Sequence, residues 1–279
     1  MENKKPDIKE LKEKAIEIRK DILTMLNAAG SGHTGGSLSM VEILITLYGY
    51  AMRHNPKKPD WPDRDKLILS KGHGCPALYT VLAHYGYFPK EELMTLRKLG
   101  SRLQGHPQRG LPGIETASGS LGQGLSISNG LALAARLDKR NTRIYCIMGD
   151  GELNEGQIWE AVMTASQYKL DNICGIVDHN KYCIDGLLKD IKCMDPLPEK
   201  WSSFGWNTID IDGHSFKDLM SAFDKAKTLK GKPTVIIAHT IKGKGISFIE
   251  CQNRWHGTTP KKDELERALK ELDEERRKI

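Results

Sequence analysis

The sequence predicts an α/β fold in which a parallel β-sheet is flanked by helices on both faces. Two observations support this prediction. Short runs of almost continuous apolar residues, such as 143–148 and 234–240, alternate with segments of helical periodicity, which is typical of parallel strands buried on both faces. Several of these runs end in polar or glycine-rich loops, and open α/β sheets bind ligands at the carboxyl ends of their strands.

The N-terminal part of the chain is predicted to place helices around one short strand. Apolar residues recur at helical spacing over 8–27, and a glycine-rich loop then leads into a second helix within 31–50. The segment 65–70 has the apolar run of a short buried strand. The segments 77–87 and 90–100 are predicted helices.

The rest of the chain alternates regularly between strands and helices. Glycines and prolines over 101–120 predict a long ordered loop. The predicted strands are 143–148, 172–178, 207–211 and 234–240, and the predicted helices are 121–137, 156–168 and 215–229. We expect the connections between neighbouring parallel strands to be right-handed.

We predict one domain over residues 1–258 and a charged C-terminal helix over 259–279. A length of 279 residues suits one large domain or two small ones. In the predicted C-terminal helix, Leu265, Ala268, Leu269 and Leu272 form a narrow apolar stripe among charged residues. We expect this helix to pack on the domain or on a partner.

Composition argues against several classes of function. The 42 basic and 36 acidic residues give a net charge of +6 and are interleaved, whereas nucleic-acid binding favours a clustered basic patch. No run of about 18 apolar residues occurs, and the first residues lack an apolar signal core. The six cysteines include no Cys-x-x-Cys pair, which indicates a reduced protein. We therefore expect a cytoplasmic protein with neither nucleic acid nor membrane as a partner.

A carboxylate stands between two glycines where the predicted strand 143–148 ends. Glycine lets the backbone approach a ligand closely, and the N-terminus of a following helix favours phosphate. Asp150 would repel a phosphate unless a cation lay between them, and Mg²⁺ prefers oxygen ligands. Asn180, after the next strand, could add an amide oxygen, and Tyr182 a main-chain carbonyl. The alternative is that Asp150 and Asn180 are only turn residues.

The nine histidines divide by their surroundings in the sequence. Four lie in loops beside glycine or proline, where a histidine is a better ligand contact than a packing residue: His33, His73, His106 and His256. Three are interpreted as ordinary surface or core residues: His54, His84 and His179. His214 and His239 lie at predicted strand ends, and their roles stay open.

These motifs together resemble a known family. Gly149-Asp150-Gly151 followed by Asn180 resembles the thiamine diphosphate binding motif. More narrowly, residues 10–258 resemble the N-terminal half of transketolase. The matching stretches, in family order, are "SGHTGGSLS", "LSKGHGCPALY", "GHP", "PGIETASGSLGQGLSISNGLALA", "GDGELNEGQIWEA", "VDHNKYCIDG" and "HTIKGKGISFIE" with "WHG".

The resemblance implies roles for individual residues. The implied metal ligands are Asp150, Asn180 and the Tyr182 carbonyl, for Mg²⁺ with Ca²⁺ or Mn²⁺ as substitutes. The implied cofactor contacts are His73, Gly119, Ser120, Leu121, Gly149, Gly151, Glu152, Asn180, Ile184 and His256. The implied catalytic residues are His33, His73 and His106. Glu155 and Glu160 match family acids near the cofactor and the subunit interface.

The resemblance also implies an activity and a partner. A transketolase transfers a two-carbon ketol unit from a ketose phosphate to an aldose phosphate with thiamine diphosphate, as in the pentose phosphate pathway. Its second domain binds the pyrimidine ring and supplies a glutamate, and no stretch after residue 258 resembles that domain. We therefore expect the N-terminal subunit of a split transketolase, active only with a C-terminal subunit in a two-plus-two heterotetramer.

Two alternatives stay open. The metal motif is shared with other thiamine diphosphate enzymes, namely 2-oxo acid dehydrogenase subunits and deoxyxylulose phosphate synthase. The stretches "SKGHG" and "GHP" favour transketolase over both. The other alternative is a cofactor-binding module without activity.

Overall fold

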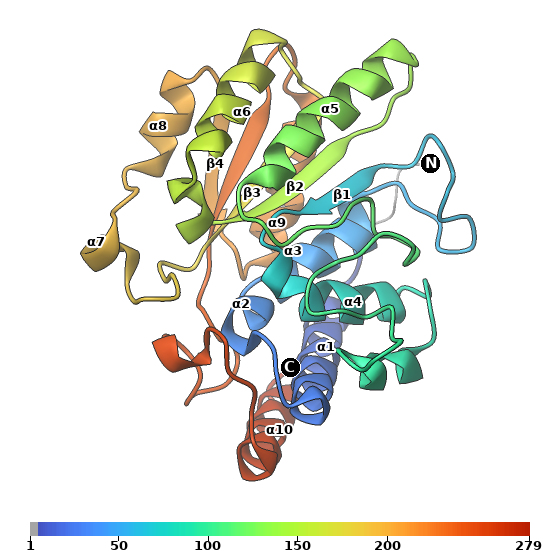
Figure 1. The fold of residues 1–279 in the computed structure, drawn as a ribbon, viewed down its shortest axis with the longest axis vertical. Coiled ribbons are helices and arrows are strands. Elements are labelled where there is room, and N and C mark those ends of the chain that lie inside the picture. Colours follow the sequence, from blue (N-terminus) through green and yellow to red (C-terminus); the bar gives the residue numbers. More distant parts are fainter. Residues whose placement is uncertain (1–4) are drawn as a thin grey trace.

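The computed structural model describes residues 5–279 and confirms the predicted parallel sheet. The sheet has five strands in the order β1-β2-β3-β5-β4, and every neighbouring pair is parallel (Figure 1). The strands are β1 (Lys66–Leu69), β2 (Ile144–Gly149), β3 (Ile173–His179), β4 (Asn207–Asp212) and β5 (Thr234–His239). All residues of β2 and β3 are buried, as their continuous apolar sequence predicts.

Helices cover both faces of the sheet (Figure 1). The longer ones are α1 (Ile8–Ala29), α4 (Cys75–His84), α5 (Gln123–Leu137), α6 (Gly156–Gln167), α9 (Phe216–Thr228) and α10 (Lys262–Arg276). The shorter ones are α2 (Thr34–Leu38), α3 (Val41–Thr46), α7 (Leu188–Ile191) and α8 (Leu197–Ser203). Short 3₁₀ segments lie at Gly72–Gly74, Lys90–Thr95, Gly151–Asn154 and Asn253–Trp255, and a π-helical turn lies at Leu47–Ala51.

Alternate residues of each strand enter two separate cores. On β2, Tyr145 and Ile147 join the larger core beneath α1, α3, α4 and α9. Cys146 and Met148 point to the opposite face and join a smaller core beneath α5, α6 and α8. This is the two-residue period of a strand buried on both faces.

The C-terminal helix α10 packs against α1. Its Ala268 and Leu272 are buried in the larger core, and Lys20 of α1 forms an ion pair with Asp273 at 2.6 Å. The N-terminus of α1 is capped by Asp7, whose side chain accepts a hydrogen bond from the Lys9 amide. Within residues 5–279, no helix is both long enough and apolar enough to cross a bilayer.

One predicted helix is largely wrong. The segment 90–100 forms a 3₁₀ turn over Lys90–Thr95 and then leaves the helical region, because Leu96 is not helical and Arg97 has a φ of 60°. Leu93 and Leu96 are both buried. Their spacing therefore matches that of a helix, although the chain leaves the helical conformation at Leu96.

The register of the strands determines where the loops after β2, β3 and β5 lie. Gly149 at the end of β2 pairs with Asp178 of β3, and His179 of β3 pairs with His239 of β5. The carboxyl ends of these three strands are therefore level with one another. Their loops form one edge of the sheet, where open α/β sheets bind ligands.

Candidate functional site

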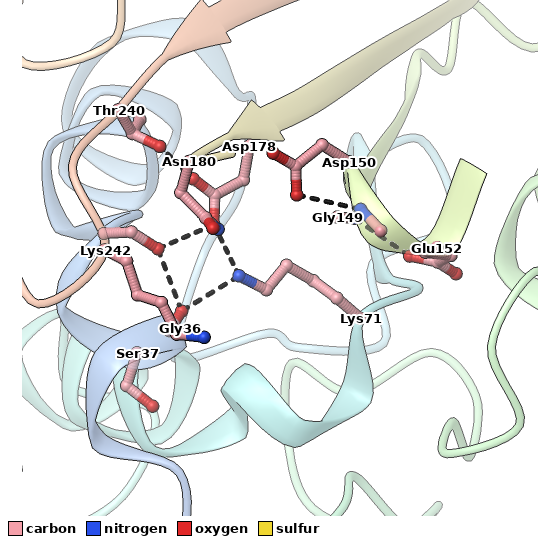
Figure 2. A network of polar contacts seen from close by, with 12 residues as sticks. Gly36, Ser37, Lys71, Gly149, Asp150, Glu152, Asp178, Asn180, Thr240 and Lys242 are labelled. Carbon is pink, nitrogen blue, oxygen red and sulfur yellow. Dashed lines mark hydrogen bonds and ion pairs between the residues drawn. The ribbon is translucent and has the colours of Figure 1, made fainter. Parts of the chain in front are cut away.

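Five segments meet at the carboxyl edge of the sheet: the loop and helix at 33–39, the segment 70–74 after β1, and the loops after β2, β3 and β5 (Figure 2). Their backbones approach closely at the glycines. A Cβ on Gly35 would lie 3.0 Å from Lys242 Cγ and 3.1 Å from the Trp255 carbonyl oxygen. The stretch "SGHTGGSLS" thus includes a glycine that lets a lysine side chain pass against the backbone.

Asp178 is the buried anion at the centre of this edge (Figure 2). Its carboxylate accepts hydrogen bonds from Lys71 Nζ at 2.5 Å, Ser39 Oγ at 2.6 Å, Asn180 Nδ2 at 3.3 Å and Thr240 Oγ1. Burial opposes ionisation, but the Lys71 charge and these hydrogen bonds lower the pKa of Asp178 below its usual value. Asp178 therefore stays ionised and ties four segments together.

Asp150 is a second buried carboxylate on the neighbouring loop. Its Oδ1 accepts from the Gly151 amide at 2.8 Å, and its Oδ2 accepts from the Lys181 amide. Burial and the nearby charge of Asp178 raise the pKa of Asp150 to about 7, against the effect of these amides. A cation beside Asp150 would offset the cost of ionising it.

Two further candidate metal ligands, Asn180 and Tyr182, lie in the loop after β3 that contacts Asp150. The Lys181 amide that bonds Asp150 lies between Asn180 and Tyr182, and the Asn180 amide oxygen accepts from the Tyr182 amide at 3.1 Å. No group of three or more His, Cys, Asp or Glu side chains suited to a metal occurs in residues 5–279. One carboxylate, one amide oxygen and one carbonyl, completed by phosphate oxygens and water, instead fit the preferences of Mg²⁺.

The structure places Glu152 differently from the other implied cofactor contacts. Its carboxylate is 2% exposed and accepts from the Gly122 amide at 2.7 Å, the Gly149 amide at 3.0 Å and Ser70 Oγ. These protein donors occupy both carboxylate oxygens. Glu152 therefore links the end of β2 to the start of α5.

The four loop histidines come together although they are far apart in the sequence. The His33 ring centroid lies 5.2 Å from that of His73, 5.7 Å from that of His256 and 6.3 Å from that of His106. The His73 and His256 rings stack at 5.4 Å. We refer to His33, His73, His106 and His256 as the histidine cluster.

Burial keeps the histidine cluster uncharged at neutral pH. Burial, and then the charge of Arg97, lowers the pKa of His33 to about 4. Burial, and then the charge of Lys242, lowers the pKa of His256 to about 3. The pKa values of His73 and His106 are also lowered, chiefly by burial. A neutral imidazole has one donor and one acceptor nitrogen, which suits contact with hydroxyl groups.

Lys242 connects the histidine cluster to the loop after β3. Its side chain is fully buried, and its Nζ lies 2.9 Å from His256 Nδ1 and 3.3 Å from the Cys183 carbonyl oxygen. Burial, and then the charge of Lys71, lowers the pKa of Lys242 to about 8. Two buried lysines therefore face a site that also holds two carboxylates.

Lys71 and Lys242 are the residues that sequence reasoning missed. Both lie just after a strand in a glycine-flanked loop, in "KGHG" and "KGKG". Lys71 Nζ also donates to the Gly36 carbonyl at 3.0 Å, at the start of the chain's second helix. Their position just after the carboxyl end of a buried strand could have identified them, because that position places the amine at the edge of the sheet where ligands bind.

The predicted segment 119–121 lies against the histidine cluster. A Cβ on Gly119 would lie 3.5 Å from the His106 ring, and Gly119 has a φ of 156°. A Cβ on Gly72 would lie 3.0 Å from the Gly119 nitrogen, so the loops pack backbone to backbone. Ser120 is exposed, and the Leu121 carbonyl accepts from Gln157 Nε2 at 3.1 Å.

Ile184 lies at the rim of the site. Its side chain is 65% exposed, and its carbonyl accepts from Asn253 Nδ2 at 2.8 Å. Asn253 begins the 3₁₀ segment that precedes His256. Glu155 and Glu160 are both exposed, at the start and on the outer face of α6.

The remaining histidines lie outside the histidine cluster. His54 lies between the Tyr48 carbonyl and the Tyr87 hydroxyl, and His84 contacts Asp21 at 2.6 Å. His179 is buried, with its ring 5.0 Å from that of His239. His214 contacts Glu42 at 3.0 Å, away from the histidine cluster.

Comparison with known proteins gives consistent matches. The family model described as "Transketolase, thiamine diphosphate binding domain" matches residues 11–277. The chain is 46% identical to a 6-deoxy-6-sulfo-D-fructose transketolase subunit of Clostridium sp. (strain MSTE9), over 95% of this chain and 97% of that protein. It is 45% identical to one of the apulose-4-phosphate transketolase subunits of Actinobacillus succinogenes, with the same coverage.

Longer proteins match over less of their length. Human transketolase is 40% identical over 96% of this chain but only 43% of its own length. Among solved structures, transketolase from Campylobacter jejuni has a TM-score of 0.89 at 33% identity, over 97% of this chain and 43% of that one. Transketolase from Leishmania mexicana has a TM-score of 0.89 at 30% identity, over 94% of this chain and 41% of that one.

Proposed function

The chain belongs to the transketolase family through its thiamine diphosphate binding domain, and from this premise we propose that it is the diphosphate- and metal-binding subunit of a two-subunit transketolase. Its relatives are transketolases, which are transferases. The observation that carries the proposal is the buried Asp150, with its raised pKa, beside Asn180 and Tyr182 and close to Lys242. Oxygen ligands for a metal and the buried Lys242 amine lie at one edge of the sheet. This combination fits a metal-bound diphosphate.

We assign the contacts to this group as follows. Asp150, Asn180 and the Tyr182 carbonyl would hold Mg²⁺, or Ca²⁺ or Mn²⁺ in its place. Lys242 would face the diphosphate, with the backbone of Gly149 and Gly151 and the side chains of His73 and His256 beside it. Glu152 would act indirectly, because its carboxylate holds the loop of Gly149.

Three members of the histidine cluster would act on the sugar. Thiamine diphosphate supplies the electron sink that stabilises a carbanion when it is bound. His33 and His106, with His73, would orient substrate hydroxyls and move protons as neutral imidazoles. The Nδ1 atom of His33 is buried without a hydrogen-bond partner among residues 5–279, and a ligand hydroxyl would satisfy it. Gly119, Ser120, Leu121 and Ile184 would complete the cofactor surface.

We also propose a partner subunit that carries the pyrimidine-binding domain. Two relatives that match this chain end to end are named as subunits, whereas human transketolase continues well beyond the matched region. Large apolar side chains remain exposed near the proposed cofactor surface and on α6, including Ile184, Ile191 and Met163. Such side chains suit burial against another chain, and we propose a two-plus-two assembly in the cytoplasm.

The donor is proposed to be a ketose that ends in an anionic group. The relatives are named for a sulfonated fructose and for apulose 4-phosphate. These names support a charged end group without deciding between sulfonate and phosphate. A phosphorylated pentose, such as xylulose 5-phosphate, is a third candidate donor with an anionic end group.

A donor panel tests the proposal. The chain, reconstituted with its partner, thiamine diphosphate and Mg²⁺, is offered xylulose 5-phosphate, 6-deoxy-6-sulfofructose and apulose 4-phosphate, each with an aldose acceptor. We expect ketol transfer without release of CO₂, and one donor preferred by roughly 100-fold or more in kcat/KM, because a site built for one end group leaves polar groups unpaired with another. Decarboxylation of a 2-oxo acid in place of ketol transfer would favour the other thiamine enzymes.

A further inference from the structure

A second buried polar network lies outside the proposed cofactor site. Arg19 of α1 forms an ion pair with Glu42 of α3 at 2.8 Å, and their side chains are only 6% and 8% exposed. Glu42 Oε2 also lies 3.0 Å from Nδ1 of His214, in the loop between β4 and α9. None of these three side chains has a role in the mechanism proposed above. We refer to Arg19, Glu42 and His214 as the clamp.

The geometry of His214 determines its protonation pattern. The Ile241 amide donates to His214 Nε2 at 2.9 Å, so that nitrogen carries no proton. Nδ1 is then the protonated nitrogen and donates to Glu42. Burial opposes ionisation of Glu42, but Arg19 and His214 lower its pKa to about 2, so at neutral pH an anion faces Nδ1. The ring therefore has one orientation that satisfies both of its partners.

The clamp holds both ends of the loop after β5. His214 binds the amide of Ile241, and Arg19 Nε donates to the carbonyl of Lys244 at 2.9 Å. Lys242 lies between these two anchors, and its Nζ reaches His256 in the histidine cluster. Gly245 has a φ of 97°, and a Cβ there would lie 3.0 Å from Arg19 Cδ, so the loop and the arginine are closely fitted.

We propose that Arg19, Glu42 and His214 are positioning residues that fix the loop after β5 and so direct the Lys242 amine at the diphosphate. The inference rests on the proposed function, because it gives Lys242 a ligand to meet. The clamp does not touch the histidine cluster or the two carboxylates. It acts through the backbone at Ile241 and Lys244.

Loss of His214 should leave the chain folded. A groove of about 860 Å³ between α1, α10 and the loop after β5 is lined by all three clamp residues. Water from this groove can reach Glu42 when the imidazole is removed, so the carboxylate is not left both buried and dry. Variants at His214 therefore report on the loop rather than on global unfolding.

The first test compares two replacements by hydrogen exchange in the chain as it stands. In His214→Gln the amide oxygen can reach the position of Nε2 and accept from Ile241, whereas in His214→Asn the shorter side chain mimics only Nδ1. We expect His214→Asn to speed exchange in residues 241–245 by roughly tenfold, the effect of one lost hydrogen bond, and His214→Gln to restore most of the protection. Equal exchange in both variants and the wild type would overturn the clamp.

The matched control is His54→Asn. His54 is also a partly buried histidine with two hydrogen bonds, to the Tyr48 carbonyl and the Tyr87 hydroxyl. The substitution His54→Asn should leave hydrogen exchange in residues 241–245 unchanged. If His54→Asn has the same effect on this loop as His214→Asn, the effect is general loosening and the assignment is wrong.

The second test measures binding of thiamine diphosphate with Mg²⁺ to the complex with the partner subunit. We expect His214→Asn to weaken binding roughly tenfold, and to weaken it no further in a Lys242→Met background, because His214 acts through Lys242. If the losses of thiamine diphosphate affinity from His214→Asn and Lys242→Met multiply in the double variant, the inference is contradicted. A wild-type complex that binds no thiamine diphosphate would instead overturn the proposed function, and the exchange result would still decide on the clamp.

Discussion

Replacing Asp150 with Asn should lower ketol transfer by roughly 1000-fold or more, the scale of losing a main electrostatic contact in a dry site. The carboxylate is 1% exposed and is the charged member of the proposed metal ligands. Gly151 and Lys181 donate to different oxygens of the carboxylate, so the asparagine amide could accept only one of these two hydrogen bonds and would bring no charge to the metal. Activity is measured at saturating thiamine diphosphate and Mg²⁺, with the partner present.

Two controls separate loss of the site from loss of the fold. Asp150→Asn should stay within about 2 kcal/mol of the wild type in urea without cofactor, because the lost hydrogen bond is offset by removal of a carboxylate whose ionised form burial and Asp178 disfavour. Asp224→Asn is the matched substitution, since Asp224 accepts from the Tyr50 hydroxyl at 2.6 Å away from the site. Activity of Asp150→Asn within tenfold of that of Asp224→Asn would contradict the assignment of Asp150 as a metal ligand.

Replacing Lys71 with Met should lower the free energy of unfolding by about 3–5 kcal/mol, the usual cost of leaving one member of a buried ion pair uncompensated. Lys71 and Asp178 have side-chain exposures of 1% and 0%, and their charged atoms lie 2.5 Å apart. The methionine fills a similar volume, so the loss is electrostatic rather than a cavity effect. Urea denaturation of the chain alone measures the change.

The double variant Lys71→Met/Asp178→Asn provides the internal check. Asparagine at position 178 removes the carboxylate charge that Lys71→Met leaves unpaired, and it keeps an oxygen that accepts from Thr240. We therefore expect the double variant to recover at least half of the stability lost in Lys71→Met. If the two substitutions instead add, then Lys71 stabilises the chain by packing and not by pairing with Asp178.

The sheet was predictable because its strands are buried on both faces. In the predicted strand 143–148, residues 144–148 are all apolar and the run stops at Gly149, and β2 spans almost the same residues. The segment 90–100 was not predictable in the same way. Leu93 and Leu96 have helical spacing, but the chain leaves the helical region at Leu96, and Arg97 then donates to the Leu103 carbonyl and to Ser31, contacts that periodicity does not indicate.

Within the candidate site, the sequence could predict residues that sit at strand ends and in distinctive motifs. Asp150 and Asn180 follow adjacent parallel strands, so their proximity follows from the fold. The pairing of Lys71 with Asp178 joins residues more than one hundred positions apart, and only the strand order brings them together. The hydrogen bonds that the Glu152 carboxylate accepts from Gly122, Gly149 and Ser70 could not be predicted either, because they depend on how the loops pack.

The decisive experiment is ketol transfer by the chain alone, by the partner alone and by their mixture, each with thiamine diphosphate, Mg²⁺ and the preferred donor. We expect no measurable turnover from either chain alone and full turnover on mixing. The same mixture prepared with Asp150→Asn should be inactive, which ties the turnover to this sheet edge. Turnover by the chain alone, at the rate of the mixture, would contradict the proposal that catalysis requires a second subunit.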